Sequence, residues 1–101
     1  MYYMIVSQDF ENSFDKRLAA RPEHICRLHE LQNAGRLLIA GPNPRIDSED
    51  PGPAGYSGSL IVAEFDSQES AQKWADKDPY IVAGVYEKTI VKPFKKVFPN
   101  A

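Results

Sequence analysis

His24 and Asp78 are the two residues of this 101-residue chain whose types best suit general acid–base chemistry. A neutral imidazole that donates one N–H to a carboxylate is held in one tautomer and orientation, and its other nitrogen becomes a better base. Such a pair can remove a proton next to a carbonyl or deliver one to a leaving group, without a nucleophile or a metal. Because the two residues lie far apart in the sequence, only the fold can unite them. A contact that merely pins a helix to a loop is the structural alternative.

The sequence around each residue predicts where it lies. Asp78 precedes Pro79, which disfavours the helical region for the aspartate, so we expect Asp78 at a corner after a helix. His24 follows Pro22 by two positions, near the start of a long helical pattern. Pro22 either kinks that helix or opens it after a shorter first helix. Both alternatives place the imidazole near the beginning of the long segment.

Five further residues are candidates for holding a substrate. Arg21 precedes the histidine by three positions and shares its helix face, where a guanidinium could bind an anion with a forked contact; a surface ion pair is an equal alternative. Ser59 and Tyr80 could donate hydrogen bonds into a cleft, although a strand-end cap and a packed aromatic ring are the favoured roles. Gly41 and Pro42 end a strand, and backbone amides near Gly41 could face the site.

The remaining reactive side chains are given structural roles. His29 lies five residues after His24 on a different helix face, whereas a metal-binding pair would use a spacing of three or four. Cys26 is expected to be a small buried apolar residue, and Arg17 to be solvated. Ser59 could complete a triad on paper, but no nucleophile elbow surrounds it. We therefore expect neither a metal nor a cofactor.

Composition and charge are those of an ordinary globular protein, and residues 1–101 are expected to form one domain. The net charge of −2 gives no general attraction to nucleic acid or to an anionic membrane. A single cysteine excludes an intrachain disulfide. The apolar start is too short for a membrane span and lacks the basic region of a signal peptide, so the cytoplasm is the expected location.

The elements that must position these residues follow the order strand, helix, strand, strand, helix, strand. Apolar runs predict strands at 2–7, 36–40, 59–65 and 85–91, the last ended by Pro93. Helical patterns run from about residue 13 to 34, capped by Asn12 or Ser13 and stopped by Gly35, and from a cap at Asp66 to about residue 77. The first helix is expected to have one face that includes Leu18, Ile25 and Leu28. Residues 42–58 are rich in proline and glycine and are expected to form a loop, which is a lid, an interface arm or a tolerated insertion.

This order predicts an α+β fold, the ferredoxin-like βαββαβ sandwich, with both helices on one face of an antiparallel sheet. Three of the strands are apolar on both sides, yet two helices can cover only one face. A second copy of the chain is the simplest cover for the other face. We therefore predict a homodimer with its sheets face to face.

Several short motifs, in this order and spacing, resemble the YciI-like (YCII-related) family of dimeric α+β barrel proteins. They lie at residues 21–24, 35–42, 58–59, 78–80, 84–85 and 91–94, so the resemblance covers nearly the whole chain. It implies an active-site His–Asp pair, which maps onto His24 and Asp78. Some relatives act as dehydrochlorinases or resemble small lactone isomerases, so the resemblance implies a type of site and no particular substrate.

The favoured hypothesis is a small cofactor-independent enzyme in which His24 is the general base or acid and Asp78 orients it. The reaction would be elimination, dehydrochlorination or isomerisation of a small anionic carbonyl or cyclic compound. The rival hypothesis is a non-catalytic, dimeric ligand-binding or interaction module in which the His–Asp contact is structural.

Overall fold

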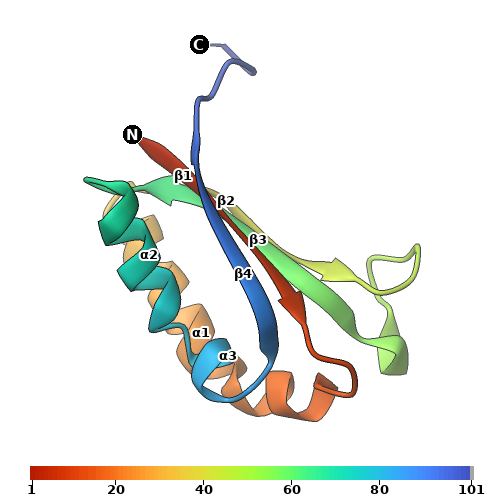
Figure 1. Cartoon of the computed structure of the whole chain (residues 1–101). Helices are drawn as coiled ribbons and strands as arrows, with labels where there is room; N and C mark the ends of the chain where they lie inside the picture. Colours follow the sequence, from red (N-terminus) through yellow and green to blue (C-terminus); the bar gives the residue numbers. More distant parts are fainter. Residues whose placement is uncertain (101) are drawn as a thin grey trace.

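Within residues 1–100, which this computed structural model describes, four antiparallel strands form one sheet in the order β2-β3-β1-β4, and all the helices lie on one of its faces (Figure 1). The strands are β1 (Tyr2–Asp9), β2 (Leu37–Pro44), β3 (Tyr56–Glu64) and β4 (Tyr86–Phe94). The helices are α1 (Phe14–Asn33), α2 (Gln68–Asp76) and the single turn α3 (Pro79–Val82), with a short 3-10 turn at Gly52–Ala54. The predicted ferredoxin-like α+β fold is confirmed.

The helix-facing side of the sheet changes from apolar to polar along its length. At one end Ile5 of β1 lies opposite Ile61 of β3 and Val91 of β4, and these side chains are buried under the helices. One row further along, Ser7 lies opposite Ser59 and Thr89, and the buried Asp9 follows. The apolar end supplies the hydrophobic core. The polar end forms the floor on which the candidate site is built.

Both edge strands are longer than predicted because they tolerate proline. β2 was expected to stop at residue 40 but runs to Pro44, and β4 continues through Pro93 instead of ending there. Proline cannot donate to a strand ladder, so it is confined in sheets to edge strands such as these. β3 also begins earlier than predicted, at Tyr56, so the irregular part of the predicted 42–58 loop is shorter.

Helix α1 is one continuous helix of 20 residues that contains Pro22, so the sequence does not divide here into two helices. Its buried side chains are Arg17, His24 and Leu31, seven residues apart. The predicted apolar face included Leu18, which is instead 53% exposed. The buried face is therefore rotated from the predicted one, because the sheet beneath the first half of α1 is polar and receives polar partners.

The helix termini differ in part from the prediction. Ser67 rather than Asp66 caps α2, since its hydroxyl oxygen accepts from the backbone N–H of Ser70 at 3.0 Å. The Ser13 side chain makes no capping hydrogen bond to α1 and donates instead to the preceding loop. Gly35 follows α1 with a φ of +71°, which confirms it as the expected stop.

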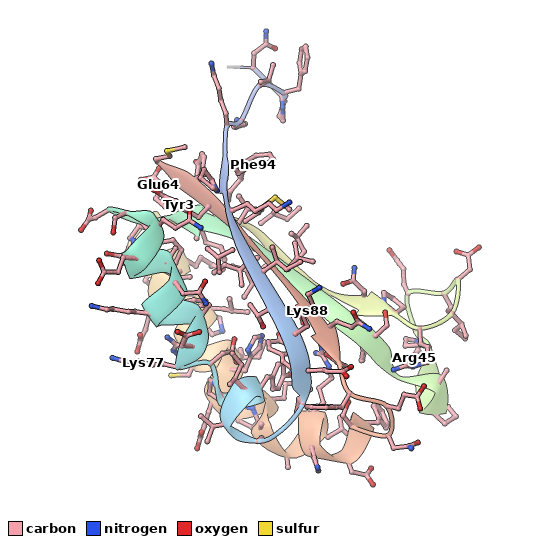
Figure 2. The ribbon with its side chains drawn as sticks, viewed as in Figure 1. Tyr3, Arg45, Glu64, Lys77, Lys88 and Phe94 are labelled. Carbon is pink, nitrogen blue, oxygen red and sulfur yellow. The ribbon has the colours of Figure 1, made fainter. Side chains whose placement is uncertain are left out.

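Among residues 1–100, no helix lies over the second face of the sheet (Figure 1). Its apolar side chains border a groove of about 480 Å³ whose lining includes Met4, Leu38, Ile39, Leu60, Val62 and Phe94. Ile39, predicted to lie in a buried strand, is 58% exposed. Phe94 lies where β4 ends and the C-terminal tail leaves the sheet (Figure 2). Within residues 1–100, no helix is both long enough and apolar enough to cross a bilayer.

Candidate functional site

The imidazole of His24 and the carboxylate of Asp78 are in direct contact, although they come from different elements. Nδ1 of His24, on α1, lies 2.8 Å from Oδ1 and 3.1 Å from Oδ2 of Asp78, at the corner between α2 and α3. Both side chains are buried. Because a carboxylate only accepts, Nδ1 of the neutral imidazole donates, and Nε2 keeps its lone pair. Nε2 has no hydrogen-bond partner within residues 1–100.

The corner itself fixes the carboxylate. Asp78 has an extended backbone (φ −59°, ψ 130°), as expected for the residue before Pro79. Its Oδ1 also accepts from the backbone N–H of Tyr80 at 2.9 Å, which caps the short helix α3. The carboxylate therefore has two fixed donors, one from its own turn and one from the imidazole, and it holds the ring in a single orientation.

Two tyrosines enclose the imidazole. The ring of Tyr80 stacks on His24 with centroids 4.0 Å apart and an interplanar angle of 14°, and Tyr86 meets both rings edge-on. Burial raises the pKa of the Tyr80 hydroxyl, and the neighbouring Arg17 guanidinium only partly offsets this. Burial also raises the pKa of Tyr86, and the neighbouring Ser59 hydroxyl only partly offsets this, since the Tyr86 hydroxyl makes no close hydrogen bond in the described chain. Both phenols are therefore protonated at neutral pH.

Arg17 was expected to be solvated, but the structure shows that this expectation is wrong. Only 6% of the residue is exposed, and its Nε donates to Oδ2 of Asp9 at 2.9 Å. Nη2 donates to the carbonyl oxygen of Gly58 at 2.9 Å and to the hydroxyl oxygen of Ser59 at 2.7 Å. The guanidinium carbon also lies 4.7 Å from the centroid of the Tyr80 ring. Burial alone would lower the pKa of Arg17, but the hydrogen bond and charge of Asp9 raise it, so the side chain stays charged.

Two signals in the sequence could have revealed this buried ion pair. Arg17 shares a seven-residue spacing with His24 and Leu31, which places all three on one face of the helix. Asp9 continues the alternation of buried residues along β1, two positions after Ser7. A further expectation was also wrong, since Cys26 is exposed rather than buried.

A cavity of about 220 Å³ opens beside the imidazole, between α1 and strands β2 and β3. It is lined by six of the seven residues that the sequence singles out, namely Arg21, His24, Gly41, Pro42, Ser59 and Tyr80. Asp78 does not line it and lies instead on the Nδ1 side of His24. Arg17 contributes to the wall, and Ile25, Leu28, Ala40 and Ile61 make part of the lining apolar.

A second cavity of about 250 Å³ continues the first toward the loop between β2 and β3. The two share four lining residues, Arg17, Arg21, Pro42 and Tyr80, so we describe them as one two-lobed groove with a histidine lobe and a loop lobe. Asp50 and Gly52 line the loop lobe, which places part of the predicted 42–58 loop at the groove.

The groove contains one cation that is paired and one that is not. The charge of Arg17 is compensated by Asp9, whereas Arg21 is exposed and forms no ion pair with any of residues 1–100. The predicted alternative of a surface ion pair for Arg21 is therefore absent from this part of the chain. Arg21 is therefore the groove cation without a counterion in the described chain, while Asp50 adds a negative charge to the loop lobe.

Comparison with known proteins then decides the family. A family model described as the YCII-related domain matches residues 1–95. The chain belongs to the YCII-related family. Protein YciI of Escherichia coli O6:H1 is 59% identical over 98 residues, a match that covers 97% of this chain and 100% of that protein. A Haemophilus influenzae protein that carries no functional name is 55% identical over the same coverage. The resemblance predicted from the short motifs is confirmed.

The YCII-related chain also has the fold of solved structures. A dehydrochlorinase that acts on 5-chloro-2-hydroxyhydroquinone, from Burkholderia phenoliruptrix AC1100, superimposes with a TM-score of 0.82 at 23% identity, covering 94% of each chain. That structure is a complex with 2,5-dihydroxybenzoquinone. An antibiotic biosynthesis monooxygenase superimposes with a TM-score of 0.51 at 13% identity, covering 96% of this chain and 99% of the other. At these identities the likeness establishes the fold.

Proposed function

We propose that this YCII-related protein is a cofactor-independent enzyme in which His24 is the general base or acid and Asp78 orients it. The observation that carries the proposal is the 2.8 Å contact between Nδ1 of His24 and Asp78 beside an open cavity. The contact leaves Nε2 as the nitrogen that exchanges protons with a substrate. A base within hydrogen-bond reach of a bound substrate is the first requirement for general acid–base catalysis.

The proposed reaction is a proton transfer coupled to elimination or isomerisation. His24 removes a proton, and the electron pair of that C–H bond forms a new double bond. In an elimination the leaving group departs with its bonding electrons; in an isomerisation an existing double bond breaks and its π electrons bind the returning proton at another atom. The similar solved structure is named for a dehydrochlorination, which is an elimination of this kind, and this supports the reaction class.

The proposed substrate is a small anionic carbonyl or cyclic compound. The histidine lobe has about 220 Å³, which suits a molecule of roughly one ring. Arg21, exposed and unpaired in the described chain, is placed to attract an anionic group, while Gly41 and Pro42 form the facing wall. The complex of the similar structure with 2,5-dihydroxybenzoquinone supports a compact cyclic ligand of this type.

A second function, a non-catalytic ligand-binding module, is favoured by one observation. His24 is buried and stacked on Tyr80, so the His–Asp contact also ties α1 to the corner before α3. If that tie were the only role of the pair, loss of the imidazole would lower stability and leave ligand binding in place.

The His24→Asn variant tests the two functions against each other. With 5-chloro-2-hydroxyhydroquinone as test substrate and chloride release as readout, loss of the base should lower kcat by about 100-fold or more. His29→Asn is the matched control, because His29 is exposed on the same helix and lies outside the groove. Equal chloride release by His24→Asn and the wild type would remove the base role.

A second measurement follows the imidazole directly. In the catalytic case, the NMR signal of His24 Nε2 should shift when 2,5-dihydroxybenzoquinone is added, because that nitrogen faces the ligand. An Nε2 signal that ignores the ligand, together with a melting temperature that falls strongly in His24→Asn, would support the structural role instead.

We also propose that the partner is a second copy of the chain, docked on the helix-free face of the sheet. That face presents the apolar side chains that line the groove of about 480 Å³, and a face of this kind is a typical protein–protein surface.

A further inference from the structure

One nitrogen of Arg17 makes no close hydrogen bond within residues 1–100. Nε and Nη2 donate to Asp9, Gly58 and Ser59, and the guanidinium also interacts with the Tyr80 hydroxyl, but no close acceptor lies at Nη1. In the described chain, the fully enclosed side-chain polar atoms without a partner belong to Arg27 and Tyr86, so Nη1 of Arg17 keeps accessible surface. Arg17 lines both lobes of the groove, which is the space that Nη1 can face.

Ser59 provides a second donor next to it. Its hydroxyl oxygen accepts from Nη2 of Arg17 at 2.7 Å, so its hydrogen can be donated either to the neighbouring Tyr86 hydroxyl or to a ligand in the lobe. Ser59 lines the same histidine lobe as His24. A hydroxyl that accepts from a cation is polarised and becomes a stronger donor. The lobe therefore holds a proton acceptor, Nε2, and two donors, which are fixed on separate elements.

We propose that Nη1 of Arg17 and the hydroxyl of Ser59 bind the carbonyl oxygen of the substrate and stabilise it as an enolate oxyanion. This inference rests on the proposed function and narrows its substrate class to enolisable carbonyl compounds. Nε2 of His24 takes the proton from the carbon next to the carbonyl, the C–H electron pair becomes the C=C bond, and the C=O π electrons move to the oxygen. The proton on His24 then returns to carbon or accompanies the departure of a leaving group.

The compensated charge of Arg17 explains why a developing oxyanion suits this position. Asp9 cancels the net charge of the guanidinium, so a neutral carbonyl can approach without displacing a bound counterion. The donors are already fixed by the buried contacts, and preorganised donors of this kind stabilise the charge that appears in the transition state. Arg21, which has no such counterion in the described chain, is left to bind a permanent anionic group at the rim.

The test uses cyclohexane-1,3-dione, which is an enolate at neutral pH, and cyclohexanone as its neutral counterpart, with binding measured by titration calorimetry. We expect the wild type to bind the enolate more tightly than the ketone. Arg17→Met should weaken enolate binding by about tenfold or more and ketone binding much less, because the hydrogen bond to the enolate oxygen is charge-assisted and the one to the neutral carbonyl is not. Ser59→Ala should weaken enolate binding less strongly. Arg45→Met is the control, because Arg45 lies on the projecting β2–β3 connection (Figure 2) and lines neither lobe.

Two further variants keep the test interpretable. Arg17→Met leaves Asp9 buried without its partner, so the double variant Asp9→Asn with Arg17→Met removes both charges and should show the same selective loss of enolate binding. Arg17→Lys keeps the charge but not the fork, and should restore enolate affinity only in part.

The outcomes separate this inference from the proposed function. His24→Asn should still bind the enolate, because the base is not one of its donors. If the enolate binds through Arg17 but the wild type does not accelerate deuterium exchange into cyclohexanone, the base role fails and the oxyanion site stands. If the wild type does not bind the enolate, or if the double variant and Ser59→Ala both bind it as the wild type does, the oxyanion site is overturned.

Discussion

The ion pair between Arg17 and Asp9 predicts an asymmetry between single and double substitutions. Arg17→Met leaves a buried carboxylate without a counterion and should lower the free energy of unfolding by about 3–5 kcal/mol. The double variant Asp9→Asn with Arg17→Met removes both charges and should recover most of that loss. Urea denaturation followed by circular dichroism measures both values. A double variant as unstable as the single one would contradict this account of the pair.

A surface pair provides the matched control for this experiment. Lys73 and Glu69 lie 3.1 Å apart on α2, with both side chains mostly exposed. Lys73→Met should change the free energy of unfolding by less than about 1 kcal/mol, because solvent screens an exposed pair. The difference between the stability losses of Arg17→Met and Lys73→Met then measures the effect of burying the ion pair.

The Tyr86 hydroxyl predicts a pH dependence of stability. Burial raises its pKa above the ordinary value of 10.0, so the folded state holds the proton more tightly than the unfolded chain. Its contribution is fully present below pH 10 and is lost as the pH rises through the folded-state pKa, since the unfolded chain then binds fewer protons. Tyr86→Phe cannot ionise and should lose less stability than the wild type above pH 10.

Denaturation of Tyr86→Phe and the wild type at pH 7 and at pH 10.5 measures this difference. At pH 7 the variant should be about as stable as the wild type or more stable, because the buried hydroxyl makes no close hydrogen bond in the described chain and Ser59 is only a weak partner. Tyr2→Phe, at a position only partly buried, is the control. Parallel losses of wild type and Tyr86→Phe at alkaline pH would show that Tyr86 is not the responsible group.

At the residue scale, the sequence predicts a contact when the local backbone constrains it. Asp78 was predictable because Pro79 restricts the aspartate to an extended conformation at a corner. The burial of Arg17 was not predictable, because a charged residue on a helix is normally solvated. Its burial depends on Asp9, which lies in another element. Pairing between elements is a property of the assembled fold.

At the scale of the elements, Gly58 of β3 packs directly against the backbone of β1. A Cβ added to Gly58 would clash with the carbonyl oxygen of Ser7, so Gly58→Ala forces the strands apart. We expect a loss of about 1–3 kcal/mol or more in the free energy of unfolding, as for other overpacked sites. The carbonyl of Gly58 also accepts from Arg17, so the same shift should disturb the groove.

Gly41→Ala is the control for this prediction. Nothing lies within 4 Å of a Cβ added at Gly41, so this variant should be about as stable as the wild type. Thermal unfolding of the two alanine variants checks the difference. Similar melting temperatures for Gly58→Ala and Gly41→Ala would mean that the strands can move apart without cost.

The sequence pattern predicts where strands lie better than it predicts where they end. Apolar runs located all four strands, but proline misled the prediction of their ends, since Pro44 and Pro93 continue β2 and β4 as edge strands. Strand order decides whether proline is tolerated, and no single segment contains that information. Likewise, α1 passes through Pro22 because its packing on the sheet outweighs one lost hydrogen bond.

At the scale of the whole molecule, the two faces of the sheet have different covers. The helices bury one face, and no helix of residues 1–100 lies over the other (Figure 1). The apolar side chains of that second face border a groove, which Lys96, Phe98 and Pro99 of the C-terminal tail also line. The sequence alone predicted this uncovered face, because three strands are apolar on both sides and the two predicted helices can cover only one face of the sheet. The way in which a second copy would dock depends on the shape of both surfaces, which a strand pattern does not contain.

The uncovered face predicts the oligomeric state. We expect sedimentation equilibrium to give twice the monomer mass of 11.4 kDa, because a stable interface needs about 800 Å² per partner and the sheet is the apolar surface available. Ile39→Glu places a charge on that face at a side chain already 58% exposed in the single chain, so it should yield a folded monomer. Val82→Glu, at an 81% exposed position on α3, should remain dimeric. Because the two variants carry the same new charge, loss of the dimer only in Ile39→Glu would locate the interface on the sheet. A wild type with the mass of a monomer would mean that this apolar face is exposed to water, and it would contradict the proposed partner.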